Sequence, residues 1–539
     1  MRTVPHRARR RRTSSFVLAL AVAVALTSCS TGGTATTAES GTGLRLAEST
    51  EYTSLHPLDH PLGITTKFYD GLVNVGENGA LEPGLAAQMP TPDEDLTTWT
   101  VQLRQDVTFS DGSDLTAEDI LAAYDAVRDP AMGSWMAADY AMVDAVTALG
   151  EHTVEFKLSH SYAGLPARLT LGIPASQALG DSVLHSSLAA EPVGTGPYVL
   201  EDWRRGESMA LASRDDWWAG DPEVERIDIA FVPDENARAQ RLRSGEFDGA
   251  QLSPRLATAL DGVNDLELVT NPSGDFRGIS LPQSLPFFQD PQVRTAVNLA
   301  TDRQAMIDGI LQGHGRPLAT PMTPAQGDSY ERSARFDHDP ARAAELLDGA
   351  GWTLTVDGVR EKDGRQFSFS LMYFAEDTLR RDLAQAFASD LSELGIRVEL
   401  EGVDRPQAAA SMADKAFVLG GGDLPYDADT QVYRQVSSDF AEYDPDDPYS
   451  NPSGYADEQV DRLLAEAREE ADPQIRAGLY RELQTRLVQN PPMVSLIALE
   501  HTYVAQGLDR WDGLAPVVEP HEHGVAWGPW WNVESWTRP

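Results

Sequence analysis

Apolar and polar positions along this chain follow two different periods, and the period changes repeatedly from one end to the other. Residues 98–104, 226–232, 367–373 and 397–400 alternate as half-buried strands do, and an apolar run covers 44–47. Apolar positions recur with helical spacing in 116–128, 235–244, 291–311, 340–347, 378–394, 456–470 and 473–488. Strands and helices that alternate over the whole length predict an α/β fold.

Local signals support several of these elements. Thr116 with Asp119 three residues later is typical of a helix N-terminus, and Asp129-Pro130 ends that helix. The long helix 378–394 leads through Gly395 into a strand, a step typical of wound α/β sheets. Such sheets bind ligands at their edges and between lobes, so we expect a site of that kind.

The first 29 residues read as a targeting segment. Six arginines and no acid precede the apolar run Phe16 to Leu26, which is too short to span a bilayer. Cys29, the only cysteine of the chain, follows Leu26-Thr27-Ser28 and resembles the bacterial lipobox. We therefore expect 1–29 to be a lipoprotein signal peptide, Cys29 to be lipidated, and 30–43, rich in Thr, Gly and Ser, to be a flexible leash. The alternative is an ordinary secretory signal with a chance cysteine.

Composition narrows the function classes. The net charge of −40, with 83 acidic and 43 basic residues, argues against nucleic acid as a partner, because phosphate backbones are held by clustered Lys and Arg. With a single cysteine, the chain forms no internal disulfide and offers no thiolate zinc site. No later stretch approaches about 20 consecutive apolar residues, so contact with the membrane is expected through the lipid anchor alone.

A series of short motifs resembles one family over residues 44 to 505. The blocks include Phe68-Tyr-Asp-Gly-Leu-Val73, Leu81-Glu-Pro-Gly-Leu-Ala86, Phe109-Ser-Asp-Gly112, Gly194-Thr-Gly-Pro-Tyr198, Asp216-Trp-Trp218, Ser244-Gly-Glu-Phe-Asp248 and Tyr455-Ala-Asp-Glu-Gln-Val-Asp461. Their order is similar to that of the family 5 extracellular solute-binding proteins, the peptide and nickel receptors of ABC importers. Most of these blocks are expected to be scaffold, and Arg294 and Arg303 are expected to form ion pairs on helix surfaces.

The resemblance implies a periplasmic-binding-protein-like fold of type II, in which two lobes close over the solute like a hinge and lobe I carries an inserted subdomain. We assign lobe I to 44–57, 190–275 and 497–539. The insertion then covers 58–189, and lobe II covers 276–496.

The segment Gly420 to Asp429 is the first candidate for contact with a solute. Dipeptide receptors of the family carry there a Gly-Asp segment that ends in Asp-Pro-Asp and binds the peptide amine. The resemblance implies that Asp427 or Asp429 holds an ammonium group, with Tyr426 in the same segment, and that Gly421 and Gly422 let the backbone approach the ligand. Ala428 stands where proline is usual, which leaves the local geometry open.

Other candidates come from both lobes. Arg380 and Arg381 lie where dipeptide receptors show a similar arginine pair, so either could bind a carboxylate, or both could simply be solvated. Tyr52 and Trp203 are candidates for lining the cleft. His521 and His523, with His56 and His60, could bind nickel or a nickel chelate, against the alternative of a packed C-terminal segment; we expect no metal and no other cofactor.

These observations predict a receptor that captures short peptides outside the membrane, on the outer face of the cell membrane, and delivers them to an ABC permease with its ATPase subunits. Nickel, a metallophore or an oligosaccharide are the alternatives within the family. A secreted lipoprotein hydrolase is a distant one, because the chain has no Gly-x-Ser-x-Gly elbow and no His-Glu-x-x-His helix, although paired acids for glycoside cleavage stay possible. We expect no enzyme activity.

Overall fold

One large mixed sheet runs through the computed structural model, which describes residues 43–59 and 62–539. The predictions for Cys29, for the signal peptide 1–29 and for the leash up to residue 42 therefore lie outside the described residues. We keep the names lobe I, insertion and lobe II for the residue ranges given above; those boundaries stay predictions.

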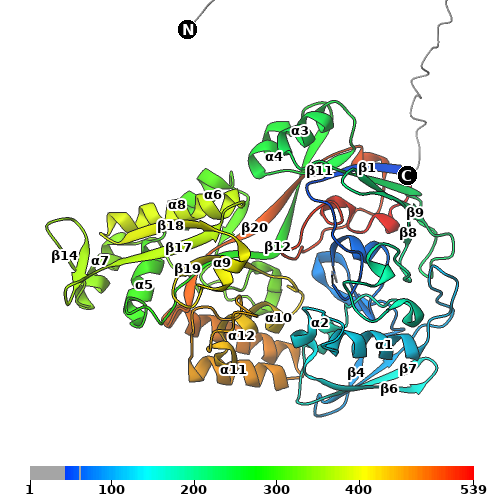
Figure 1. Ribbon diagram of the computed structural model, residues 1–539, viewed down its shortest axis with the longest axis horizontal. Coiled ribbons are helices and arrows are strands. Elements are labelled where there is room, and N and C mark those ends of the chain that lie inside the picture. The colour runs from blue at the N-terminus through cyan, green and yellow to red at the C-terminus, as the bar shows by residue number, and fades with distance from the viewer. Residues whose placement is uncertain (1–42, 60–61) are drawn as a thin grey trace, which may run out of the picture. The chain divides into compact units, whose positions relative to one another are not determined.

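The large sheet has eleven strands in the order β18-β17-β19-β12-β20-β11-β1-β10-β9-β8, with β13 paired to β20 (Figure 1). Its strands are β1 Gly43–Glu48, β8 Tyr198–Arg204, β9 Ser208–Ser213, β10 Arg226–Phe231, β11 Gly249–Gln251, β12 Leu266–Ser280, β13 Gly315–Pro317, β17 Ser368–Phe374, β18 Arg397–Val403, β19 Ala416–Gly421 and β20 Met493–Gln506. β1, β8, β9, β10 and β11 belong to lobe I, and β17, β18 and β19 belong to lobe II.

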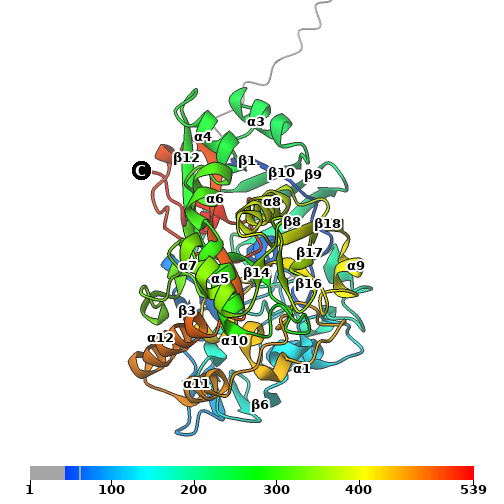
Figure 2. The ribbon, with the colours of Figure 1, turned by 90° about the vertical axis from the view of Figure 1, so that its left-hand side faces the viewer.

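The two long strands β12 and β20 join these halves of the sheet. They pair antiparallel from Leu266 opposite Gln506 to Ser280 opposite Met493, with an irregularity between Pro272 and Phe276. Figure 1 shows them side by side near the centre, with the strands of the two lobes on either side, and Figure 2 views the molecule from the lobe II side. The chain therefore crosses between the lobes along two adjacent strands.

The insertion has its own sheet and its own core. Strands β4 Thr91–Pro92, β5 Thr98–Gln102, β7 Thr153–Leu158 and β6 Val143–Gly150 form a four-stranded sheet, and β2 Val73–Val75 pairs with β3 Leu81–Pro83. Helix α1 Ala117–Arg128 packs on the four-stranded sheet, and its first turn carries the predicted capping box of Thr116 and Asp119. One hydrophobic cluster, which runs from Leu58 to Val183, fills this subdomain.

The remaining elements complete both lobes. A small sheet of β14 Thr353–Leu354, β15 Arg360–Lys362 and β16 Arg365–Gln366 extends from lobe II. The other helices are α2 Leu165–Arg168, α3 Glu235–Arg243, α4 Pro254–Leu260, α5 Pro291–Ala300, α6 Arg303–Ile310, α7 Pro340–Gly349, α8 Thr378–Glu393, α9 Arg405–Ala409, α10 Ala428–Val436, α11 Glu458–Glu469 and α12 Pro473–Gln489. Helices α3, α7, α8, α11 and α12 agree with the predicted helices to within two residues, whereas α2, α4, α9 and α10 were not predicted.

The predicted single helix over 291–311 is wrong. Thr301 is extended and ends α5, and the Asp302 side chain then caps α6 by accepting a hydrogen bond from the Ala305 N–H. The predicted surface ion pairs of Arg294 and Arg303 are also wrong, because both side chains are buried. Each guanidinium donates to backbone carbonyls, Arg294 to Pro491 at 2.7 Å and Arg303 to Ser495 at 2.7 Å. These bonds join α5 and α6 to the start of β20.

Within residues 43–59 and 62–539, no helix has both the length and the apolar character needed to cross a membrane.

Candidate functional site

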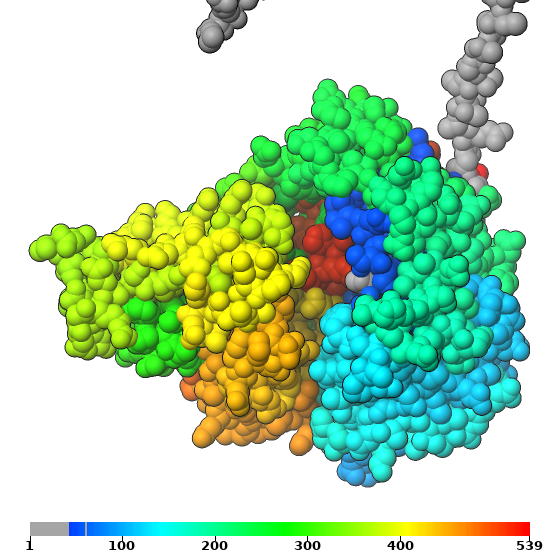
Figure 3. All heavy atoms as spheres, in the orientation of Figure 1, coloured from blue at the N-terminus to red at the C-terminus, as the bar shows by residue number. Residues whose placement is uncertain are grey.

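A cleft with a volume of about 470 Å³ separates the insertion from lobe II. Trp135 and Arg168 line it from the insertion, residues 420–424 line it from lobe II, and His521 of the C-terminal segment reaches it as well. Figure 3 shows the surface hollowed between the yellow and orange segments of lobe II and the blue and cyan segments opposite, with red C-terminal residues at the bottom. This cleft is the candidate site.

Asp423 supplies an unpaired carboxylate to the cleft. It lies in the loop between β19 and α10, and it is exposed to the cleft. No hydrogen bond or ion pair from the described part of the chain reaches its carboxylate. Burial among neighbouring segments raises the pKa of Asp423, and His521 opposes that shift. A carboxylate left in this situation is a ready acceptor for a cationic group of a ligand.

Glu522 adds a second carboxylate from the C-terminal segment. Burial, followed by the charges of Asp423 and Glu48, raises its pKa to about 7. Among the described residues, its carboxylate also has no hydrogen-bond or ion-pair partner. Asp423 and Glu522 thus concentrate negative charge between lobe II and the C-terminal segment.

Arginines supply the opposite charge on the lobe II side of the same cleft. The guanidinium groups of Arg380 and Arg405 lie 5.2 and 4.8 Å from the centre of the Phe374 ring. Asp377 pairs with Arg380, which also donates to the Val418 carbonyl at 3.2 Å. Arg405 is exposed, and no carboxylate among the described residues pairs with it. A ligand carboxylate can therefore bind at this end.

The predicted arginine pair is divided between two environments. Arg380 is largely buried and lines the cleft, and burial and the nearby Arg277 lower its pKa. Arg381, the next residue on α8, is partly exposed and pairs with Asp382 at 3.0 Å, and it does not line the cleft. Consecutive residues on a helix point about 100° apart, so only one of the two can face the cleft.

Asp427 and Asp429 have cationic partners within the protein. Asp427 caps α10 and pairs with both terminal nitrogens of Arg476, one of them at 2.8 Å. Asp429 is only 1% exposed, and it accepts from Arg468 at 3.0 Å and from the Tyr162 hydroxyl at 3.0 Å. The expectation that either aspartate binds an ammonium stays a prediction. The structure gives Asp429 another role, since Tyr162 belongs to the insertion and the bond links the insertion to lobe II.

A second set of contacts links the same two parts of the chain. Asp139 of the insertion pairs with Arg168 at 3.2 Å and with Arg434 of α10 at 3.1 Å. Arg434 also pairs with Asp447. All four residues line the cleft, so these ion pairs close it on one side.

The glycines that precede Asp423 allow a close approach of backbone segments. Gly420, Gly421 and Gly422 all line the cleft. Gly422 has φ +104°, and a Cβ there would lie 2.0 Å from the Gly274 carbonyl oxygen, so no other residue fits. A Cβ at Gly420 would lie 2.6 Å from a terminal nitrogen of Arg380. The glycines therefore bring the Asp423 loop against β12 and against the cleft arginine.

Three other predicted residues lie outside the lining of this cleft. Tyr426 packs beside Leu62, Val517 and Trp527 and has a buried hydroxyl without a partner among the described residues. Tyr52 lies edge-on to Phe231 and donates to Glu48 at 3.4 Å. Trp203 donates its indole N–H to Glu51 at 3.1 Å, and Arg205 stacks on its ring at 3.4 Å. The structure brings Arg380, Gly421, Gly422 and His521 together at the cleft.

An ionic cluster lies beneath His521, between β12 and β20. The His501 ring bonds with Asp275 at 3.3 Å and with Glu519 at 2.7 Å, and His521 bonds with Asp275 at 2.7 Å. Burial opposes the charge on His501, but these hydrogen bonds raise its pKa to about 9. Burial alone would raise the pKa of Asp275. The positive charge of Arg277, followed in size by that of His521, instead holds this pKa well below its usual value.

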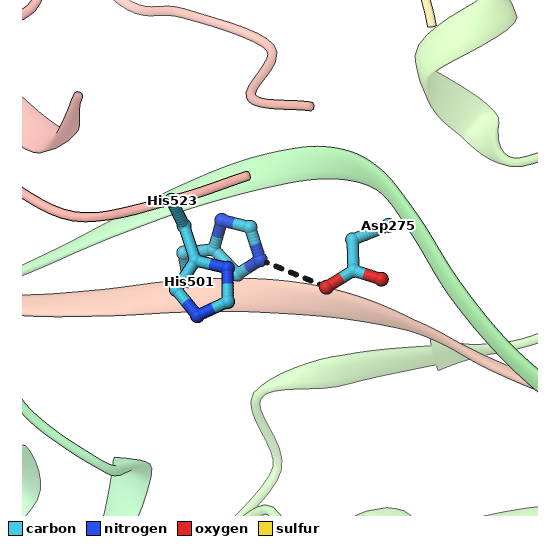
Figure 4. Close-up of side chains that lie close together, drawn as sticks. All are labelled: Asp275, His501 and His523. Atoms are coloured by element: carbon cyan, nitrogen blue, oxygen red, sulfur yellow. Dashed lines mark hydrogen bonds and ion pairs between the residues drawn. The ribbon is translucent and has the colours of Figure 1, made fainter. Parts of the chain in front are cut away.

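The same cluster bears on metal binding. Asp275, His501 and His523 offer ligand atoms within 4.8 Å of one another, and Figure 4 shows the two rings lying together beside the aspartate. Both ring nitrogens of His501 are bonded to carboxylates, so the ring carries a proton at each and has no free lone pair at neutral pH. A metal ion would have to displace that proton. His523 bonds through Nδ1 to the His521 carbonyl and keeps Nε2 free.

Comparisons with known proteins agree with this architecture. The family model for bacterial extracellular solute-binding proteins, family 5 Middle, matches residues 80–477. Protein XP55 of Streptomyces lividans is 37% identical over 455 residues, which cover 84% of this chain and 82% of that protein.

Solved structures show the same fold. NikZ from Campylobacter jejuni, in complex with Ni(L-His), superposes with a TM-score of 0.78 at 25% identity and covers 92% of this chain and 99% of that one. The oligopeptide-binding protein AppA from Bacillus subtilis, in complex with a nonapeptide, gives a TM-score of 0.73 at 21% identity with the same coverage. The fold is α/β and of the type II periplasmic-binding-protein class, as predicted. This chain belongs to family 5 of the bacterial extracellular solute-binding proteins, the solute receptors of ABC importers.

Proposed function

We propose that this receptor captures a short peptide in the cleft and delivers it to an ABC permease and its ATPase subunits. The observation that supports a peptide is the presence, in one cavity, of the Asp423 carboxylate and the Arg405 guanidinium, neither of which has an ion-pair partner among residues 43–59 and 62–539. A peptide is a zwitterion and needs one partner of each sign, both placed where closure excludes water.

In this proposal, Asp423 accepts hydrogen bonds from the peptide ammonium, and Glu522 strengthens the negative potential there. Arg405 and the free terminal nitrogen of Arg380 bind the peptide carboxylate. Asp427 and Asp429 then act through Arg476 and Arg468, by fixing the loop and the contact with Tyr162. In this proposal the ammonium contact is made by Asp423, in the loop before α10, and not by Asp427 or Asp429 at the start of that helix.

Binding and release need no catalytic group, and we propose that the protein turns over no peptide or glycan. Incubating the purified protein with peptides and glycans and analysing the products by mass spectrometry tests this. Hydrolysis of any of them would contradict it.

The proposed anchor is a diacylglycerol-type modification at Cys29, which would hold the receptor on the outer face of the cell membrane. In cell fractions, the wild-type protein should partition with membranes, and a Cys29→Ser variant should appear in the soluble fraction. Equal partitioning of both would contradict lipid anchoring.

Native mass spectrometry of the protein purified from its own cells tests the choice of solute. A mass excess that fragments into a short peptide is the expected result. A bound nickel complex, metallophore or sugar in place of peptide would refute the proposal.

A receptor for a metal complex is the second candidate, because Asp275, His501 and His523 lie within reach of one ion. It requires His501 to lose the proton that its two carboxylate partners stabilise. Titration calorimetry with Ni²⁺, alone and with histidine, separates the candidates: saturable binding that His523→Ala abolishes would favour the metal complex.

A further inference from the structure

A second crevice, of about 390 Å³, lies apart from the peptide cleft. Lobe I and the insertion form it, mainly through four segments: residues 62–71, the β2–β3 hairpin, residues 217–219 after β9, and the C-terminal residues 526–535. Of its lining residues, only Thr170 also lines the cleft. A ligand in this crevice would therefore be held independently of the proposed peptide.

Five aromatic residues contribute to the lining of the crevice. Trp217, Trp218, Trp527, Trp531 and Tyr69 all line it. The rings of Trp217 and Trp218 lie 5.6 Å apart between centres, at an angle of 59°. Indole faces attract cations through the quadrupole of the ring, more strongly than the other aromatic side chains do.

The protein already uses one of these rings in that way. The Arg104 guanidinium lies 4.4 Å from the centre of the Trp218 ring. The Trp218 indole N–H donates to Asp70 at 2.8 Å, which fixes the orientation of the ring. The crevice thus holds aromatic faces in place before any ligand arrives, which lowers the entropic cost of binding.

Every charged residue among the described residues that line the crevice is acidic. They are Asp70, Glu77, Glu82 and Glu534. Glu534 is paired with Lys67 at 2.8 Å, and Asp70 accepts from Trp218 and Thr195, so these two carboxylates are occupied. Glu82 is exposed and has no hydrogen-bond or ion-pair partner within the described residues. Its carboxylate lies over Gly76, where a Cβ would approach it to 2.4 Å, so the hairpin turn holds it close.

Three buried donors of residues that line the crevice have no acceptor among the described residues: the Tyr69 hydroxyl and the indole N–H groups of Trp217 and Trp527. The Trp527 side chain is 5% exposed, and its indole N–H has no acceptor among the described residues. A buried donor without an acceptor costs free energy, and a ligand oxygen that accepts from it would recover that cost. The crevice therefore combines cation-binding faces, an available carboxylate and a free donor.

We propose that this crevice binds a small organic cation that carries an acceptor oxygen, such as a hydroxylated alkylammonium. Aromatic faces and the Glu82 carboxylate bind the cationic group, and the Trp527 N–H donates to the oxygen. The absence of any basic lining residue among those described excludes anions from the same space by charge repulsion.

Titration calorimetry and tryptophan fluorescence with choline and with tetramethylammonium test the proposal on the full mature protein. Both cations should bind saturably, and choline should bind more tightly because only choline offers an oxygen to Trp527. Trp217→Leu should weaken binding about three- to thirtyfold, the range expected for one cation–π contact. Glu82→Gln keeps the side-chain shape and should also weaken choline binding. It therefore tests the site even if Trp217→Leu fails to fold.

Two controls make the result specific. Glu118→Gln removes an exposed acid from α1, away from the crevice, and should leave choline affinity unchanged. Asp423→Asn should leave choline affinity unchanged while it weakens peptide binding, so failure of one proposal is distinguishable from failure of the other. No saturable binding of either cation, or loss of choline binding in Asp423→Asn with no effect of Glu82→Gln, would overturn the proposal.

Discussion

Replacing Asp423 with asparagine keeps the shape of the side chain and removes the charge that, in the proposed function, binds the peptide ammonium. No cation of the described residues pairs with Asp423, so the substitution leaves no buried arginine without a partner. The stability of the free protein should therefore change by less than about 0.5 kcal/mol. The effect should appear in peptide affinity alone.

The size of that effect follows from the surroundings of Asp423. A hydrogen bond to a charged group contributes about 1.5–3 kcal/mol net. Glu522 stays beside the site and keeps part of the negative potential, which places the expected loss near the lower end. A loss of about 2 kcal/mol corresponds to about thirtyfold weaker binding.

Titration calorimetry with a free peptide and with its N-acetylated form isolates the contact. Acetylation removes the ammonium, so it should weaken binding to the wild-type protein about as much as Asp423→Asn does. Acetylation should have almost no further effect on the variant, because the two changes remove the same interaction. If acetylation weakens binding to the variant as strongly as to the wild type, Asp423 does not bind the ammonium and the reasoning is refuted.

Asp429→Asn, in the first turn of α10 just after the loop that carries Asp423, is the matched comparison. This carboxylate pairs with Arg468 in a buried setting, and removal of one partner of a buried ion pair costs about 3–5 kcal/mol. Asp429→Asn should lower the melting temperature markedly, whereas Asp423→Asn should not. The opposite pattern would return the ammonium contact to Asp429.

Three further predictions concern stability and closure. The two carboxylates that flank His501 raise its pKa from 6.5 to about 9. Folding therefore gains about 3 kcal/mol that is fully present below about pH 6.5 and is lost as the pH rises to about 9. Urea unfolding across this range should show the loss in the wild type, and a His501→Gln variant with the same pH dependence would contradict it. Tyr162→Phe removes one hydrogen bond from the insertion to Asp429 and should weaken solute binding about tenfold or more by disfavouring closure, with a larger radius of gyration in X-ray scattering; unchanged affinity would show that this contact does not support closure. Gly422→Ala should destabilise the fold by more than about 1 kcal/mol, because its Cβ would meet the Gly274 carbonyl, and an unchanged melting temperature would mean that the loop can move away.

Local patterns predicted the elements that local interactions determine. Helix α1 begins where Thr116 and Asp119 form a capping box, and α8 leads into β18 as its glycine predicts, because caps and amphipathic spacing act within a few residues. The helix over 291–311 was predicted too long. Its apolar pattern is helical throughout and does not show the break at Thr301, after which Asp302 caps a new helix.

The cleft could be predicted only in part. The loop after β19 was found from its glycines and acids, but the resemblance favoured Asp427 and Asp429, and only the structure shows which carboxylates are paired. The cluster beneath the cleft was not predicted at all. Asp275 and His501 are 226 positions apart, and the pairing of β12 with β20 that joins them leaves no local signal in either strand.

The central place of β20 has a consequence for how the protein folds. β20 lies between β12 and β11, and it is the last strand along the chain, so the large sheet stays in two pieces until nearly the whole chain has been made. β1, near the start of the described residues, must also pair with residues 226–231 of β10 and 249–250 of β11. Contacts of such high sequence separation slow folding, because loop-closure entropy is lost before they form. The topology of the chain therefore predicts slow folding. The step that limits it is the pairing of β20, within the final 47 residues, with the edge strands of the two preformed parts of the sheet.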